Sequence, residues 1–210
     1  MSGRDYWMTV AETADTDDVR EHILAGYKEG KPFTPYVPTL AMPDRVESVL
    51  DFGCGLGRNF PYLTGLARTV AGFDLPPMIA RCRTAPAPAV DLLSSDWNQL
   101  RPLHFDLIFA SLVLQHVEPH PMRTFLRDFS HMAPAVYLLT RTDTDFGEQV
   151  LQVIAGLGFF ETGDCVEVDH DPETHQLKVV GTRSFEEALA LPAGRHVETM
   201  LRSLRTAEHG

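Results

Sequence analysis

The stretch "VLDFGCGLGRN", residues 49–59, decides the fold. An apolar run ends at Asp51 and leads directly into Gly53, Gly55 and Gly57. A strand that turns straight into a helix presents backbone N–H groups at the helix start, and glycines let a ligand approach the main chain and tolerate positive φ. The third glycine lies one residue earlier than the dinucleotide-binding fingerprint requires, and Arg58 takes that position. The stretch therefore predicts a binding loop for a nucleotide-like ligand that is not a dinucleotide.

Short β-rich apolar runs alternate with segments that can be helical around this loop. Such alternation implies parallel strands joined by crossover helices, which is a doubly wound α/β sheet. Two later β-like runs flank the turn-rich "DPETH" and predict an antiparallel hairpin. The predicted fold is α/β and Rossmann-like, with seven strands, mostly parallel with a C-terminal antiparallel hairpin, and flanked by helices. The predicted strands are residues 46–52, 69–74, 89–93, 105–110, 135–140, 165–170 and 176–182.

Helical periodicity is clearest at residues 121–132, where Pro121 suits a first helical position. Similar stripes occur at residues 17–27, 146–157 and 197–204. They predict three parts: an N-terminal helical cap or lid at residues 1–45, a core at residues 46–183 and a C-terminal helical tail at residues 184–210.

Composition narrows the class of partner. The 210-residue chain has a formal net charge of -11 and no run of Lys or Arg, which disfavours a nucleic-acid partner. No apolar stretch approaches the ~20 residues of a membrane span, so no membrane partner is expected. The three cysteines are odd in number and far apart, as in proteins of a reducing compartment. Together these features predict a cytoplasmic location.

Two acidic residues follow the next two predicted strands. Asp74 ends the second strand about twenty residues beyond the loop, where doubly wound folds place an acid that binds ribose hydroxyls. Asp96 and Trp97 follow the third strand, where a carboxylate can accept from an amine and an indole can cover a purine. Alone, each acid is more often a helix cap or a turn residue. Their placement at successive strand ends indicates a shared site.

With these motifs the chain resembles the class I S-adenosylmethionine-dependent methyltransferases. "VLDFGCGLGRN", "VAGFDLPPM", "SSDWNQL" and "FDLIFASLVLQHV" are similar to the motifs of that family, over about residues 46–183. The family's Pro-Gly-Gly-like turn before the fifth strand is replaced by "SHMAPAVYLL". The resemblance implies an enzyme that uses S-adenosylmethionine and releases S-adenosylhomocysteine.

The resemblance also assigns cofactor-binding residues. Motif I residues would line the methionine end of the cofactor, Asp74 the ribose, Asp96 with Trp97 the adenine, and the residues after the fourth strand the sulfonium. The implied set is Asp51, Gly53, Cys54, Gly55, Asp74, Leu75, Asp96, Trp97, Ser111 and Leu112.

His116, after the fourth strand, is the candidate catalytic base, because a hydroxyl or ammonium acceptor must lose a proton. The alternative is a histidine that only hydrogen-bonds its loop. No metal site is expected, since Glu118-Pro119 breaks the helix that would bring His116 and His120 onto one face. The position of the [DN]-P-P-[YF] motif of nucleobase- and amide-directed members reads "ASLVLQ", so the resemblance implies a small-molecule O or N acceptor.

Several alternatives stay open. The aromatic residues of the N-terminal part either form a lid over the site or anchor a cap to the core. The protein is expected to be a monomer or homodimer. The competing functions are a nicotinamide-dependent oxidoreductase on a similar sheet and a non-catalytic cofactor-binding module. The aromatic residues concerned are Tyr6, Trp7, Tyr27, Phe33 and Tyr36.

Overall fold

The computed structural model describes residues 3–14, 45–85, 89–141, 165–171 and 176–182. The helices predicted at residues 17–27, 146–157 and 197–204 lie outside these described residues. So do Tyr27, Phe33 and Tyr36 of the expected aromatic set.

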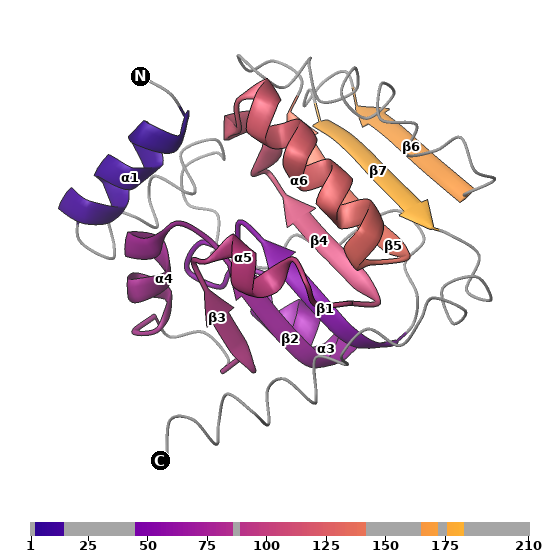
Figure 1. Cartoon of the computed structure of the whole chain (residues 1–210), viewed down its shortest axis with the longest axis horizontal. Coiled ribbons are helices and arrows are strands. Elements are labelled where there is room, and N and C mark those ends of the chain that lie inside the picture. Colours follow the sequence, from indigo (N-terminus) through magenta and orange to yellow (C-terminus); the bar gives the residue numbers. More distant parts are fainter. Residues whose placement is uncertain (1–2, 15–44, 86–88, 142–164, 172–175, 183–210) are drawn as a thin grey trace.

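Seven strands form one sheet with the order β3-β2-β1-β4-β5-β7-β6 (Figure 1). The first five strands are parallel, β7 is antiparallel to β5, and β6 is antiparallel to β7. The prediction of an α/β Rossmann-like fold with a parallel sheet is confirmed. The strands are β1 Val46–Phe52, β2 Ala67–Phe73, β3 Leu92–Ser94, β4 Leu107–Ser111, β5 Ala135–Arg141, β6 Cys165–Asp171 and β7 Gln176–Thr182.

Two strands begin later than the apolar pattern predicts, because acidic side chains replace the strand ladder there. The carboxylate of Asp91 accepts the Val70 N–H at 3.0 Å, and β3 starts only after it. Asp106 likewise directs its carboxylate to β1, so that β4 starts at Leu107. A hydrophobicity pattern counts apolar residues and cannot tell which backbone donors a carboxylate will take.

Helices cover both faces of the sheet. They are α1 Gly3–Thr13, α3 Phe60–Leu66, α4 Pro76–Cys82, α5 Trp97–Leu100 and α6 Pro119–Met132, with a 3-10 turn, η1, at Leu114–His116. Helix α6 begins at Pro119, two residues before the predicted start, with Glu118 as its N-cap. Pro121 still lies in the first turn, where a missing N–H costs no helical hydrogen bond, so two prolines fit there.

The core divides into two layers. One face of the sheet packs against α5 and α6 through Leu50, Phe52, Ile108 and Ala110, together with Leu126 and Phe129 of α6. The other face packs against α3 and α4. Buried strands of this kind are apolar on both faces, which is characteristic of a parallel sheet covered by helices. The second layer contains Val49, Val70, Leu107, Phe109, Tyr137, Phe60, Leu63, Ile79 and Cys82.

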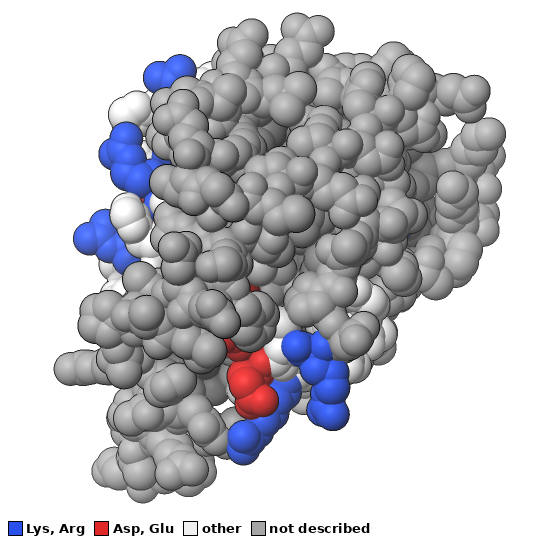
Figure 2. All heavy atoms as spheres, turned by 90° about the vertical axis from the view of Figure 1, so that its right-hand side faces the viewer, with Lys and Arg blue, Asp and Glu red and all other residues white. Residues whose placement is uncertain are grey.

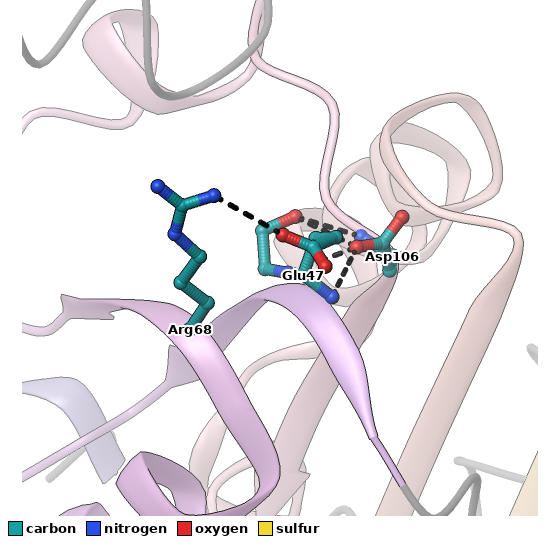
Figure 3. A network of polar contacts seen from close by, with 4 residues as sticks. Glu47, Arg68 and Asp106 are labelled. Carbon is teal, nitrogen blue, oxygen red and sulfur yellow. Dashed lines mark hydrogen bonds and ion pairs between the residues drawn. The ribbon is translucent and has the colours of Figure 1, made fainter.

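A polar network fastens β1 to β4 at the amino end of the sheet (Figure 3). One oxygen of Asp106 accepts the N–H groups of Glu47 and Ser48, both at 2.9 Å, and the Ser48 hydroxyl at 3.3 Å. The Ser48 hydroxyl in turn accepts the Asp106 N–H at 3.1 Å. Arg68 and Glu47 form an exposed ion pair at 3.8 Å beside this network. The network sets the β1–β4 register at the end of the sheet opposite to the glycine loop.

Figure 2 shows basic side chains of the described residues in separate groups, one of them beside acidic side chains. Within the described ranges, no helix has the length and apolar character that crossing a membrane would require.

Candidate functional site

The site lies at the carboxyl ends of β1 and β4, where the strand order reverses direction. Ligands of doubly wound sheets bind in the crevice at this switch point. The loop after β1 and the turn after β4 touch there: a Cβ on Gly53 would lie 2.4 Å from Val113 Cγ2. Gly53 also has φ of 76°. Only glycine therefore fits at this position, because the conformation and the space both exclude a side chain.

The glycine loop differs from expectation in how its N–H groups are used. The N–H groups of Gly53 and Cys54 both donate to the Phe73 carbonyl, at 2.8 and 3.1 Å. The Gly55 N–H donates to Asp74, and that of Gly57 to the Cys54 carbonyl at 2.9 Å. These four donors have protein partners, so the loop is built by tying its backbone to the end of β2. What the loop offers a ligand is close approach to the main chain at its glycines, rather than these four N–H donors.

Asp74 connects the loop after β2 to the glycine loop. Its Oδ2 accepts the Gly55 N–H and its Oδ1 the Leu75 N–H, each at 2.7 Å. Desolvation raises the pKa of Asp74 from 3.8 to about 6, although both N–H donors lower it. A carboxylate has about four acceptor positions, so each oxygen can still accept a further donor. The structure thus brings Asp74 to Gly55, a contact that the motif spacing did not indicate, and its binding of a ligand's hydroxyls stays a prediction.

Asp51 is the most unusual group of the site. Its side chain is fully buried, and neither oxygen has a hydrogen-bond partner among the described residues. Burial and then the charge of Asp74 raise the pKa of Asp51 from 3.8 to about 8. The Asn59 side chain lowers this pKa only in part, through an interaction that falls short of full hydrogen-bond geometry. Buried polar groups are normally paired, so an unpaired carboxylate indicates a place for a missing partner. A cationic group is the partner that an ionised carboxylate requires.

Cys54 and Leu75 pack beside the site as apolar residues. Cys54 is buried beside Cys82 and Gly72, and the Cys82 thiol and burial raise its pKa well above the ordinary value. Leu75 packs at the edge of the cluster that holds α1. Both contribute shape and packing to the walls around the glycine loop.

The structure places Asp96 and Trp97 in different roles. Asp96 is the N-cap of α5 and accepts the Asn98 N–H at 2.9 Å. The Trp97 ring packs edge-on against Phe52, with centroids 5.5 Å apart, and its indole N–H donates to Asp128 at 2.7 Å. Trp97 is thus anchored in the core layer under α6, whereas the carboxylate of Asp96 is exposed beside it. Their contact with an adenine remains a prediction.

Ser111, Leu112 and His116 lie together after β4. Ser111 is the last residue of the strand, and Leu112 has φ of 57° while its N–H donates to the Leu139 carbonyl at 2.7 Å. A non-glycine residue in this left-handed region is uncommon and marks strain of the kind found at functional sites. His116 ends η1, with its Nε2 3.4 Å from Gln115 Nε2. Burial lowers the pKa of His116 below its ordinary 6.5.

Helix α1 covers this region and was missed by the sequence analysis. Its Trp7 ring lies edge-on to His116, with centroids 5.5 Å apart, and a Cβ on Gly3 would lie 2.3 Å from the His116 carbonyl oxygen. Its residues Val10 and Ala11 pack with Leu56 and Met78. The signal was present, since Trp7, Val10, Ala11 and Ala14 follow helical spacing, but the polar sequence between them masked it.

Asn59 and Arg81 are further residues that the motifs did not indicate. Asn59 is buried at the N-cap of α3, yet its side chain makes no capping hydrogen bond and lies near Asp51. Arg81 of α4 donates to two carbonyls of α1. No group of three or more metal-ligating side chains occurs within the described part of the chain.

Comparison with known proteins agrees with this geometry. The family model described as "Methyltransferase domain" matches residues 26–197. No curated protein sequence matches the chain significantly. Among solved structures, the N-methyltransferase NodS from Bradyrhizobium japonicum WM9, in complex with S-adenosyl-L-homocysteine, matches with a TM-score of 0.58 and 14% identity. The match covers 88% of this chain and 100% of NodS.

Two further structures share the fold. Magnesium protoporphyrin IX methyltransferase (ChlM) from Synechocystis PCC 6803, with bound SAM, has a TM-score of 0.52 and 14% identity, over 87% of this chain and 91% of ChlM. The pyocyanin biosynthetic protein PhzM has a TM-score of 0.53 and 16% identity, over 84% of this chain and 61% of PhzM. At these identities the likeness concerns the fold alone.

The family match spans most of the chain and includes both the glycine loop and the region after β4. It decides against the nicotinamide-dependent oxidoreductase and the non-catalytic module. The chain belongs to the methyltransferase-domain family, as a class I enzyme that depends on S-adenosylmethionine.

Proposed function

We propose that this enzyme transfers the methyl group of S-adenosylmethionine to an oxygen or nitrogen atom of a small-molecule acceptor, with His116 as the base. The observation that carries the proposal is the buried Asp51, without a hydrogen-bond partner among the described residues, behind a glycine loop of positive φ, with His116 in the 3-10 turn that follows β4. NodS is named as an N-methyltransferase and ChlM for magnesium protoporphyrin IX, a small molecule, which supports this class of acceptor.

The residues present fit the methionine end of the donor. The donor carries an ammonium group, and Asp51 is a carboxylate that lacks a partner within the described structure. The approach of a cation would favour ionisation of Asp51 and offset part of its burial. Gly53 and Gly55, with φ of 76° and 55°, leave room for the donor to lie against the main chain.

The ribose and adenine follow along the strand ends. Asp74 has acceptor capacity for two hydroxyls while it keeps its bonds to Gly55 and Leu75. Asp96 presents an exposed carboxylate one strand further, where it can accept from an exocyclic amine. Ser111 and the strained Leu112 border the space between the glycine loop and His116, which is where the sulfonium would lie.

The donor supplies a methyl group on a sulfonium that is already activated, so the protein mainly aligns the acceptor and keeps water away. The lowered pKa leaves His116 neutral at pH 7, and a neutral imidazole can accept the proton that an acceptor hydroxyl or ammonium loses. The methyl group leaves sulfur for the acceptor oxygen or nitrogen, the S–C bonding electrons stay on S-adenosylhomocysteine, and the proton passes to His116.

We also propose how the chain is divided into parts, where it is located and in which oligomeric state it acts. The antiparallel pairing of β6 and β7 supports a seven-stranded sheet closed by a C-terminal hairpin, and the packing of α1 supports an N-terminal cap at residues 1–45. The core then spans residues 46–183 and the tail residues 184–210. Two buried free thiols, Cys54 and Cys82, support a reducing, cytoplasmic setting. A monomer or homodimer without a nucleic-acid partner is the form that we propose.

The test is release of S-adenosylhomocysteine from S-adenosylmethionine in the presence of a library of small-molecule hydroxyl and amine acceptors. We expect turnover with one chemical class, and a loss of about 10²-fold or more in kcat for His116→Gln, the scale of general-base catalysis. His120→Gln, which alters an exposed histidine on α6, is the matched control and should retain full turnover. Equal turnover of both variants would remove His116 from the mechanism, and no turnover with any acceptor would contradict the proposed activity.

A further inference from the structure

Helix α1 lies across the elements that form the donor site. Its Val10 and Ala11 pack on Leu56 of the glycine loop and on Met78 of α4. Its other end reaches the turn after β4, where Trp7 contacts His116. Figure 1 shows α1 beside α4, outside the carboxyl ends of the central strands. The helix therefore bridges the three chain segments between which the donor would lie.

Arg81 joins α1 to α4 by a two-point contact. Its Nε donates to the Ala11 carbonyl and one terminal nitrogen donates to the Ala14 carbonyl. Ala11 lies in the last turn of α1 and Ala14 directly follows the helix, where a helix end has acceptors without helical partners and a negative dipole end. A guanidinium supplies both the positive charge and the fork of donors that this geometry requires.

We propose that Arg81 is a positioning residue that holds α1 closed over the donor site, so that S-adenosylhomocysteine leaves only after the fork between Arg81 and the α1 carbonyls opens. The part of this inference that concerns release of S-adenosylhomocysteine rests on the proposed function. The apolar contact of α1 is modest, since only Val10 and Ala11 of the helix are buried and Trp7 is partly buried beside them. A single charged anchor at its C-terminal end therefore contributes a large share of what keeps it in place.

Loss of the contact between Arg81 and α1 should change the rate of product release more than the rate of methyl transfer. Loss of the fork removes no hydrogen bond of Asp51, Asp74 or His116, because Arg81 donates to the end of α1; His116 is affected only through its contact with Trp7 of α1. Opening of a covering element frequently controls product release. Residue Trp7 on α1 and Trp97 on α5 are the two tryptophans of the chain, so fluorescence can follow the motion of α1.

The experiment compares the full-length chain with Arg81→Ala, Arg81→Lys and Arg83→Ala. Arg83 is the matched control, since it lies two residues further along, is exposed, and donates to the Leu93 carbonyl instead of to α1. Amide hydrogen exchange of residues 3–14 measures the closure of α1 without ligand. Stopped-flow tryptophan fluorescence measures dissociation of S-adenosylhomocysteine, and Trp7→Phe identifies the signal of α1.

We expect Arg81→Ala to speed exchange in residues 3–14 about tenfold and ligand dissociation about fivefold, with exchange in β1 unchanged. Arg81→Lys keeps the charge but lacks the fork, so it should lie between Arg81→Ala and the unaltered chain. Arg83→Ala should behave as the unaltered chain does. A merely structural role would instead lower the unfolding temperature without a selective change in α1 exchange.

Wild-type exchange and dissociation in Arg81→Ala would overturn the proposal. If Arg81→Ala does not fold, Arg81→Lys decides in its place, and wild-type rates in that variant would equally overturn the need for the fork. If the unaltered chain does not bind S-adenosylhomocysteine, the proposed function fails and the donor part of this inference fails with it. The exchange rates of residues 3–14 then still decide whether Arg81 holds α1.

Discussion

At the scale of single residues, Asp51 shows a conflict between function and stability. A carboxylate without a partner in the interior destabilises the folded chain, yet it is what a bound ammonium group requires. Strain of this kind persists at functional sites because the surrounding core supplies the missing stability. Around Asp51 that core includes the fully buried Val49 and Leu50 of β1.

Asp51→Asn should therefore stabilise the ligand-free protein and weaken donor binding. The folded-state pKa of Asp51 is about 8 and its ordinary value is 3.8, so between these values the folded chain holds a proton that the unfolded chain lacks. Stability of the unaltered chain then falls as the pH rises through this window, and the Asn variant lacks that fall. We expect an advantage of roughly 1–3 kcal/mol for Asp51→Asn at about pH 7.5 and almost none near pH 4.

Chemical denaturation at both pH values measures this difference, and calorimetry with S-adenosylhomocysteine measures the loss of affinity. Calorimetry in buffers of different ionisation enthalpy adds a second check, since a cation that binds beside protonated Asp51 should displace its proton. A variant that binds the ligand as well as the unaltered chain does, or one that is less stable at both pH values, would contradict the assignment of Asp51.

At the scale of elements, the glycine loop depends on the turn that faces it. Gly53 cannot carry a side chain, because its Cβ would lie 2.4 Å from Val113 Cγ2 and 2.6 Å from Val113 Cβ. Gly65 in α3 is different, since a Cβ there would meet nothing within 4 Å. Two glycines in adjacent elements thus have opposite roles, one needed by contact and conformation and one without either constraint.

Gly53→Ala should destabilise the chain by roughly 2–4 kcal/mol, from positive φ and overpacking together, and should separate the loops after β1 and β4. Gly65→Ala should stabilise it by roughly 0.5–1 kcal/mol, because alanine restricts the unfolded chain and suits a helix. Thermal and urea unfolding of the two variants give these values. Val113→Ala should not rescue Gly53→Ala, since the Val113 Cβ remains too close; full rescue would refute the contact argument.

At the scale of the whole molecule, the two ends of the sheet serve different purposes. The carboxyl end holds Asp51, Asp74 and His116, whereas the amino end holds the Asp106 network that fastens β1 to β4 (Figure 3). Binding groups at one end and stabilising groups at the other can therefore be altered separately, because sites without shared partners behave additively.

Asp106→Ala should lower the free energy of unfolding by roughly 2–3 kcal/mol, since two backbone donors and a hydroxyl lose one acceptor. Arg68→Ala is the matched control: its ion pair with Glu47 has side chains 67% and 81% exposed, so we expect a change within about 0.5 kcal/mol. The affinity of the folded fraction of both variants for S-adenosylmethionine should stay unchanged. An affinity loss in folded Asp106→Ala would show that the two ends are coupled.

The sequence alone determined the sheet and the position of the loop. β1 Val46–Phe52 matches its predicted range, because its largely apolar residues lead directly into a glycine turn. The acid at Asp74 was predicted by its distance from the loop, and the structure brings it to Gly55. These features depend on local order along the chain, which sequence periodicity records.

Only the tertiary structure decided which groups face each other. The sequence cannot show that Asp51 lacks a partner, that Val113 excludes a side chain at Gly53, or that Arg81 reaches α1 across 70 and 67 residues. Each of these depends on contacts between segments far apart in the chain. Burial and pKa depend on what surrounds a group in three dimensions, and a linear pattern carries no record of those surroundings.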